Sequence, residues 1–303
     1  MCPNTDYITH LTSLSIIEIS GDDASSFLQA QMTGDINKLK DGESQFSAWC
    51  NAAGKVIATF IVSRNIDRYY LILPVDILDT VYRRLKMYVF RAKVNLSYMT
   101  NSHTCLGACM QNPETVQNEF INKVFSSIKI PVPNDPTRVI FISANNEMPA
   151  LFAGIAAHGT RIIPDESWQI TDMTTGIPWI CHATSEQFLP QELNLEPLGG
   201  LSYNKGCYPG QEIIARLHFR GRQKRQLCTG YIQTSGPLPA PGINLPSQTE
   251  SQTAGAILNC VRESDSLVRV LAVIDTEKTG TDTVTLGNGD LLHLTLVSDQ
   301  SDS

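Results

Sequence analysis

The sequence reads Lys205-Gly206-Cys207-Tyr208-Pro209-Gly210-Gln211-Glu212 at its most informative point. One cysteine stands there among two glycines and a proline, and Ile213-Ile214-Ala215-Arg216 follow directly. Pro209 is typical of the first turn of a helix, and the side chains that follow it place acceptors near the positive end of that helix. The pattern therefore predicts that Cys207 lies just before a helix N-terminus.

Three features of this stretch favour thiolate over thiol at Cys207. The helix N-terminus, Lys205 beside it and Arg216 about one turn inside the helix each stabilise negative charge on sulfur. Cys207 is therefore the candidate functional thiol. The alternative is a tight glycine turn that carries a buried, inert cysteine, and the residues alone leave both interpretations open.

Further motifs lie on both sides of this stretch. They are Phe27-Leu28-Gln29-Ala30-Gln31, Gly54-Lys55, Tyr88–Val94, Gly176-Ile177-Pro178, Phe188–Leu195, Ala215-Arg216 and Phe219–Arg225. With the eight-residue signature, this order resembles the YgfZ family of folate-binding proteins, relatives of the glycine-cleavage aminomethyltransferase. The match covers most of residues 14–232, and the signature with its flanks is highly specific.

The resemblance implies an α+β fold in two parts. Residues 1–225 would form an aminomethyltransferase-like folate-binding body of antiparallel sheets with packing helices. Residues 226–303 would form an antiparallel β-barrel, and their short strands with turns rich in Gly, Pro, Ser and Thr favour the same architecture.

The implied function is that of a tetrahydrofolate-binding accessory protein for iron–sulfur cluster assembly or repair. It would bind tetrahydrofolate or a one-carbon derivative and support cluster enzymes, including those that methylthiolate tRNA. Its partners would be iron–sulfur enzymes or assembly proteins. Two alternatives stay open, a folate-dependent one-carbon (aminomethyl) transferase and a non-catalytic tRNA-binding protein, so whether the chain is an enzyme is undecided.

The resemblance also assigns candidate folate-binding residues. Trp168 matches a folate-linked tryptophan ahead of the Gly176-Ile177-Pro178 segment and would supply a flat wall for the pterin. A second family tryptophan falls at Leu14, where leucine still offers an apolar face. Arg91 and Arg216 are cationic candidates for the glutamate tail, and Lys93, Arg220 and Arg222 are further cations that could serve the tail or a partner.

Two departures weaken the transferase alternative. Thr174 stands where the aminomethyltransferases have a glutamate that contacts the pterin. No equivalent of the aspartate that those enzymes use near the folate is evident. The sequence therefore shows no general base placed for one-carbon transfer.

Composition and the N-terminus predict a globular, cytoplasmic protein. Apolar residues make up 42% of the 303 residues and charged residues 17%. No apolar run approaches the ~20 residues of a membrane span, and the start of the chain lacks the basic and apolar regions of a secretory signal. The eight cysteines contain no Cys-x-x-Cys pair and are expected to be reduced. His103, Cys105 and Cys109 form the tightest cluster, but without a fourth ligand nearby no metal site is predicted.

The net charge of −7 conceals a basic segment. Residues 205–225 hold six Lys or Arg and one acidic residue, a net +5, which leaves −12 for the rest of the chain. Such a stripe can bind nucleic acid. Since no RNA-binding signature accompanies it, an anionic small molecule in a cleft is favoured over direct tRNA binding.

The hydrophobic pattern predicts the order of elements. Strands are expected at 14–19, 45–51, 55–64, 69–74, 91–98, 104–110, 138–143, 227–233, 254–262, 266–275 and 291–297. Helices are expected through Phe27, Leu28 and Gln31, with Asp22 or Asp23 as the cap, and at 76–90, 114–124 and 167–175. The second α/β piece, at 101–160, could be a divergent repeat of the first, although no residue identity shows it.

Overall fold

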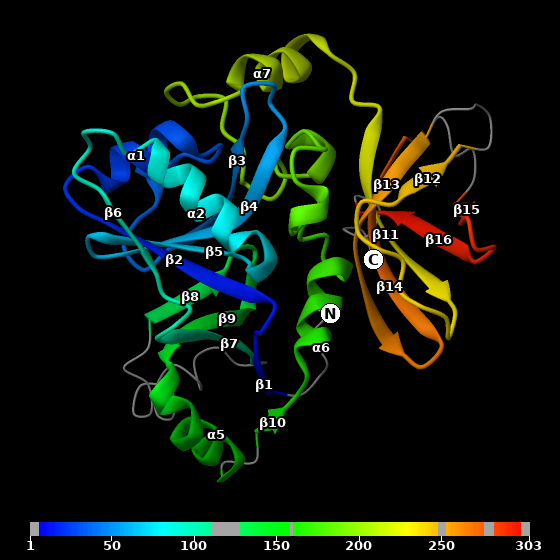
Figure 1. Ribbon diagram of the computed structural model, residues 1–303, viewed down its shortest axis with the longest axis horizontal. Coiled ribbons are helices and arrows are strands. Elements are labelled where there is room, and N and C mark those ends of the chain that lie inside the picture. The colour runs from blue at the N-terminus through cyan, green and yellow to red at the C-terminus, as the bar shows by residue number, and fades with distance from the viewer. Residues whose placement is uncertain (1–5, 111–127, 158–159, 248–252, 276–281, 298–303) are drawn as a thin grey trace.

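Three antiparallel-rich sheets make up the molecule (Figure 1). The computed structural model describes residues 6–110, 128–157, 160–247, 253–275 and 282–297. Two five-stranded sheets build the N-terminal body, and a six-stranded sheet follows at the C-terminal side. The described part of the chain contains no helix that is long and apolar enough to cross a membrane.

The first sheet has the order β3-β4-β5-β2-β6, with antiparallel pairs throughout. Its strands are β2 (Leu14–Ser20), β3 (Ser44–Cys50), β4 (Val56–Asn65), β5 (Arg68–Pro74) and β6 (Asn95–Tyr98). The expected helices are present as α1 (Ala24–Gln31) and α2 (Leu78–Met87). The first eight residues of β4 are all buried, as expected of a strand with covered faces.

The prediction that an aspartate side chain caps α1 is wrong. Asp23 occupies the N-cap position, but its side chain makes no capping hydrogen bond. Its carboxylate instead accepts the backbone N–H of Lys93 at 2.7 Å. Asp23 therefore ties the start of α1 to the segment that leads into β6, a long-range contact that the local sequence pattern does not reveal.

The second sheet has the order β10-β1-β7-β9-β8. Its strands are β1 (Tyr7–His10), β7 (His103–Cys109), β8 (Ile128–Val132), β9 (Asp135–Ala144) and β10 (Arg161–Ile162), and α5 (Met148–Ala157) follows β9. The pair β1–β10 is parallel. The helix expected at 114–124 lies outside the described residues. Strand β8 was not predicted, because Pro131 interrupts its apolar run.

The two sheets repeat one topology. In each, a hairpin (β4–β5 or β8–β9) leads through a three-residue 3-10 helix into a ten-residue helix (α2 or α5). The second hairpin strand then pairs with the strand that begins the unit, β5 with β2 and β9 with β7. The divergent repeat that the sequence left open is thus present in the backbone.

The C-terminal sheet is antiparallel and nearly closed, which confirms the expected barrel-like architecture. Its order is β12-β13-β14-β11-β16-β15, and the end strands β12 and β15 contact each other. Its strands are β11 (Arg225–Gln233), β12 (Asn244–Pro246), β13 (Thr253–Ser264), β14 (Leu267–Asp275), β15 (Thr283–Thr285) and β16 (Leu291–Leu296). The three-residue strands β12 and β15 were not predicted, since such short segments carry no periodicity.

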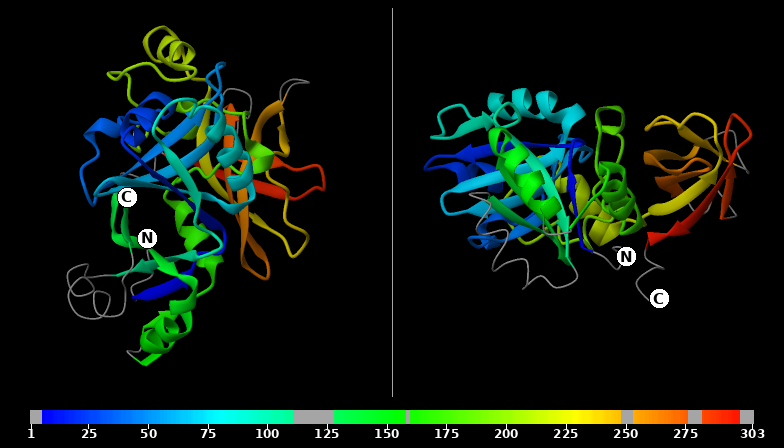
Figure 2. Two further views of the ribbon diagram at one scale, coloured as in Figure 1. Left: turned by 60° about the vertical axis from the view of Figure 1, so that its left-hand side comes forward. Right: turned by 90° about the horizontal axis from the view of Figure 1, so that it is seen from below.

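Helix α6 (Asp165–Thr174) lies between the N-terminal body and the C-terminal sheet (Figures 1 and 2). It contacts β13 and β14 on one side and β1 on the other. The largest hydrophobic cluster also continues from the body into the sheet through Leu227, Leu258 and Leu271. The division at 225/226 therefore stays a prediction, and α6 is the element that brings the two parts together.

Candidate functional site

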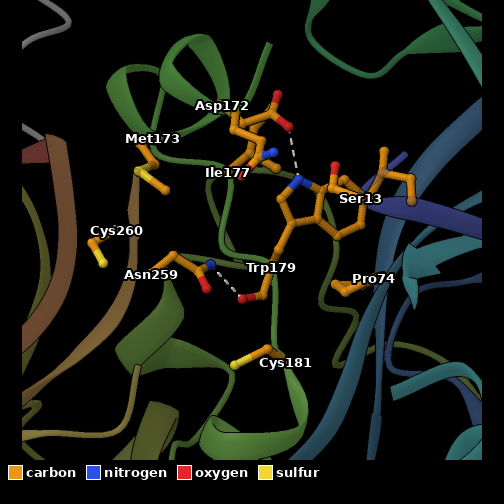
Figure 3. Close-up of a pocket in the computed structure, with 11 residues that line it drawn as sticks. Ser13, Pro74, Asp172, Met173, Ile177, Trp179, Cys181, Asn259 and Cys260 are labelled. Atoms are coloured by element: carbon orange, nitrogen blue, oxygen red, sulfur yellow. Dashed lines mark hydrogen bonds between the residues drawn. The ribbon is translucent and has the colours of Figure 1, made fainter. Parts of the chain in front are cut away.

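A pocket opens where α6 meets the first sheet and the C-terminal sheet (Figure 3). Its volume is about 100 Å³. The lining residues are Ser13, Leu14, Pro74, Gln169, Asp172, Met173, Ile177, Trp179, Cys181, Asn259 and Cys260. Because these residues come from four separated parts of the chain, the pocket exists only in the folded molecule.

Trp179 supplies the flat wall of this pocket. Its indole Nε1 donates to Oδ2 of Asp172 at 2.8 Å, and its backbone oxygen accepts the side-chain amide of Asn259 at 2.7 Å. Figure 3 shows both bonds, one from α6 and one from β13. Asp172 therefore fixes the indole ring, and Asn259 fixes the backbone that carries it. An aromatic face held in this way is suited to bind a planar heterocycle.

The carboxylate of Asp172 forms an ion pair with a buried arginine. Arg138 is fully buried; its Nη1 lies 2.6 Å from Oδ1 of Asp172 and its Nε lies 2.7 Å from Oδ2 of Asp135. Burial raises the pKa of Asp172, while Arg138 and the Trp179 indole oppose that rise. Both carboxylate oxygens already accept a hydrogen bond, so Asp172 orients the wall and is poorly placed to act as a free base.

Of the two pterin-wall candidates from the sequence, Leu14 lines the pocket and Trp168 does not. The Trp168 ring is 1% exposed and lies under Arg138, whose guanidinium carbon is 4.7 Å from the ring centre. Gly107 makes room for it, since a Cβ there would come within 2.6 Å of the ring. Contact of Trp168 with a ligand stays a prediction, and in this structure the side chain supports Arg138.

Trp179 and Asp172 were missed from the sequence although signals for both were present. Trp179 directly follows Gly176-Ile177-Pro178, and Asp172 lies four residues after Trp168, on the same helix face. Neither signal shows whether this face of α6 is directed toward the pocket or toward the core. That direction is set by the Arg138 ion pair, which comes from β9.

Cys207 is exposed, so the alternative of a buried cysteine is wrong, and the reactivity of the thiol stays a prediction. Within the described residues no hydrogen bond or ion pair of its thiol is recorded. Helix α7 (Gln211–Arg220) begins after it with Gly210 as the N-cap, so Pro209 precedes the helix and is not in its first turn. The thiol is thus presented on a loop and contributes little to packing.

The other signature residues hold this loop in place. Lys205 Nζ donates to the backbone oxygens of Met32 and Gly34, both at 2.7 Å, and lies 5.2 Å from the ring centre of the buried Tyr208. Burial lowers the pKa of Lys205 to about 8. Its ammonium therefore fastens the loop to the segment after α1. The expected role of Lys205 as a partner of the Cys207 thiolate is not supported.

Two glycines of separate motifs meet at the base of the loop. Gly210 has φ of +80°, and a Cβ there would lie 2.5 Å from the Cα of Gly54 and 2.6 Å from the backbone oxygen of Asn51. Gly54, at φ of +74°, caps the β3–β4 turn and faces Ile213 and Ile214 of α7. The signature loop is therefore docked on this hairpin through a contact that only glycine permits.

Gly210→Ala is expected to destabilise the protein by roughly 1–2 kcal/mol from the left-handed backbone alone, and further through the clash with Gly54. Gly206→Ala is the matched control, because a Cβ at Gly206 meets nothing within 4 Å. Urea denaturation of both variants measures the difference. Equal stability of the two would show that the Gly54–Gly210 contact does not hold the loop.

Cys207 lines a separate, open depression on α1. The other residues of this depression are Asp22, Ser25, Ser26, Gln29, Ala30, Asn37 and Gly206. It shares no residue with the pocket at Trp179. The α7 end of the molecule lies apart from α6 in Figure 1. The structure thus presents the thiol and the pocket as two distinct sites.

The cationic candidates lie outside both sites. Arg91 and Arg216 are exposed, and neither lines the pocket or the Cys207 depression. Glu212, in the first turn of α7, is also exposed. The roles of Arg91 and Arg216 in binding a folate tail stay predictions.

The remaining cysteines are mostly core residues, as expected. Cys50, Cys105 and Cys228 are buried free thiols, but Cys109 is disulfide-bonded, so the expectation that every cysteine is reduced is wrong there. Across the described ranges, no group of three or more His, Cys, Asp or Glu side chains is arranged to hold a metal ion.

Comparison with known proteins gives a consistent result. The GCVT N-terminal domain matches residues 5–114. Two proteins named tRNA-modifying protein YgfZ are similar over most of the chain. The one from Colwellia psychrerythraea is 27% identical over 88% of this chain and 85% of its own length. The one from Klebsiella pneumoniae is 28% identical over 88% and 84%. The fold also matches glycine cleavage system aminomethyltransferase T from Bartonella henselae, with a TM-score of 0.74, 13% identity, and 96% of this chain and 85% of that chain covered.

Proposed function

This chain belongs to the YgfZ family, and we propose that it is a tetrahydrofolate-binding accessory protein for iron–sulfur cluster assembly or repair. In this role it supports cytoplasmic cluster enzymes, including those that methylthiolate tRNA. The observation that carries the proposal is the combination of a fixed indole wall in a pocket of an aminomethyltransferase-like fold with an exposed thiol in the intact family signature.

The pocket residues fit the ring end of a reduced folate. Leu14, Met173 and Ile177 provide apolar surface beside the Trp179 face. A carboxylate has about four lone-pair sites, so Asp172 keeps acceptor capacity for ring N–H groups after binding Arg138 and Trp179. Tetrahydrofolate, when bound, would supply a one-carbon carrier. The residues here bind and orient its ring, and the small volume leaves the rest of the ligand outside this pocket.

Cys207 is the group that we assign to chemistry with a partner. The thiol is exposed at the surface, on a loop held by Lys205, Tyr208 and Gly210. A client protein can therefore reach it without opening the core. Because the pocket lies elsewhere, we propose that folate acts on the fold or on a separate step and does not react with this thiol.

The transferase alternative has less support at this pocket. Asp172, the acidic side chain of the lining, is held by Arg138 and Trp179. The Thr174 hydroxyl donates to the backbone oxygen of Ile170 at 2.8 Å. A free general base is what that reaction requires, and these residues do not offer one.

A deletion strain tests the proposed function. We expect reduced activity of cluster enzymes and reduced tRNA methylthiolation under oxidative stress, both restored by the wild-type chain. The measurement is the methylthioadenosine content of digested tRNA. Unchanged methylthiolation and cluster-enzyme activity in the deletion strain would refute the proposal.

A further inference from the structure

A second cavity has no role in the proposed function. It has a volume of about 400 Å³ and shares Leu14 with the pocket at Trp179. Its polar lining comes from four places in the fold, with His10 on β1, Ser15 on β2, His103 and Thr104 at the start of β7, and Asn145 after β9. Strands far apart in the sequence thus bring imidazole, hydroxyl and amide groups to one space.

The lining carries no fixed charge, since the described residues that form it include no Asp, Glu, Lys or Arg. Asp165 bonds to a lining residue but does not itself line the cavity. Its Oδ2 accepts the hydroxyl of Thr12 at 3.2 Å and the backbone N–H of Ser13 at 2.8 Å. The ligand class is therefore decided by the hydrogen-bonding groups that face the cavity.

Two paired groups each keep one proton for a ligand. The hydroxyls of Ser15 and Thr100 lie 2.7 Å apart, and only one of their two protons lies in the shared bond. His10 Nε2 and the Thr104 hydroxyl also lie 2.7 Å apart. Whichever of that pair donates, the other group retains its own proton, on Nδ1 or on the hydroxyl.

Asn145 supplies one more spare donor to the cavity, whereas His103 supplies an acceptor. The Asn145 amide donates one N–H to the backbone oxygen of Asn101 at 3.2 Å, which leaves its second N–H available. The Ser102 hydroxyl donates to the oxygen of Met99 at 3.2 Å. At 2.8 Å from the same hydroxyl, His103 Nδ1 must then be the donor, so Nε2 of the neutral ring is an acceptor and is not counted among the donors.

We infer that this cavity binds a carboxylate-bearing small molecule. Spare donors converge on it while the apolar side chains of Leu14, Ile16, Val75 and Met148 line the same space, a combination that suits a carboxylate on a short methylene chain. Two sources carry this chemistry. One is the glutamate tail of a folate whose ring lies across Leu14, which rests on the proposed function. The other is a free dicarboxylate, which does not.

The test follows the imidazole NMR resonances of His10 and His103 in the full chain. Glutarate, tetrahydrofolate and a tetrahydropterin without the tail are titrated separately. A saturable shift with glutarate identifies a free carboxylate site. A shift with tetrahydrofolate but not with the tetrahydropterin identifies the folate tail.

Asn145→Ala and Ser15→Ala are each expected to weaken the effective ligand about tenfold, the loss of one hydrogen bond to a charged group. Asn145 is exposed, so its variant keeps the test valid if Ser15→Ala does not fold. Ser266→Ala, at an exposed turn, is the matched control.

The inference is overturned if neither glutarate nor tetrahydrofolate shifts these resonances, or if both variants bind like the wild type. Tetrahydrofolate binding reported by Trp179 fluorescence without any imidazole shift would refute this inference alone. A glutarate shift without tetrahydrofolate binding would instead refute folate binding and leave the cavity assigned.

Discussion

Cys207→Ser is expected to abolish restoration of tRNA methylthiolation in a deletion strain and to leave the melting temperature unchanged. Serine is close in size to cysteine, and the Cys207 side chain is exposed. The substitution therefore leaves the stability of the fold unchanged. Function is lost because a hydroxyl is a far poorer nucleophile and metal ligand than a thiol at neutral pH.

Cys50→Ser is the matched control for this variant. Cys50 is 1% exposed, so a buried hydroxyl there is expected to cost on the order of 1–3 kcal/mol and reduce function only in proportion to folded protein. Full restoration by Cys207→Ser would show that the signature serves architecture alone.

Iodoacetamide labelling gives an independent reading of the same site. Burial raises the pKa of Cys105 to about 12 and that of Cys260 to about 11, and both are less accessible than Cys207. Cys207 should therefore be alkylated first among the free cysteines of the described chain. Faster labelling at either of the other two would contradict the exposed-loop account.

Arg138→Met is expected to destabilise the protein by about 3–5 kcal/mol, the range seen when one partner of a buried ion pair is removed. The guanidinium is fully buried between Asp135 and Asp172, and both carboxylates would be left without their cation. Trp179 would also lose a fixed partner, so folate binding should fall in the same variant. Urea denaturation measures the stability change.

Arg83→Met provides the comparison, since it removes the same side-chain type from a surface pair. Arg83 and Asp79 are 77% and 62% exposed, and such pairs contribute roughly 0–1 kcal/mol. Equal costs for the two variants would mean that the buried pair does not organise the pocket.

The sequence predicts the fold where its signals are local. Strands β2, β4, β5 and β14 are rich in apolar residues, and helix α2 carries a clear helical spacing. Strand β8 and the three-residue strands were missed because a proline or a short length removes the pattern. In each of these cases the sheet neighbours, and not the segment itself, select the strand.

The site was less predictable because its contacts join distant residues. Gly54 and Gly210 were both noted as motif residues, yet they lie far apart in the sequence and meet only in the folded chain. Lys205 lies two positions before Cys207 in the sequence. Its ammonium nevertheless donates to the backbone oxygens of Met32 and Gly34 and not to the thiol. Trp179 gains its role from Asp172 and Asn259, which belong to different parts of the fold.

Titration of the purified chain with tetrahydrofolate tests the central claim most directly. We expect one binding site in the wild type and binding at least about tenfold weaker in Trp179→Ala, since an aromatic wall is lost. Tyr231→Ala, on the outer face of β11, should bind like the wild type. Absence of binding to the wild type, or equal affinity in Trp179→Ala, would contradict a folate site at this pocket.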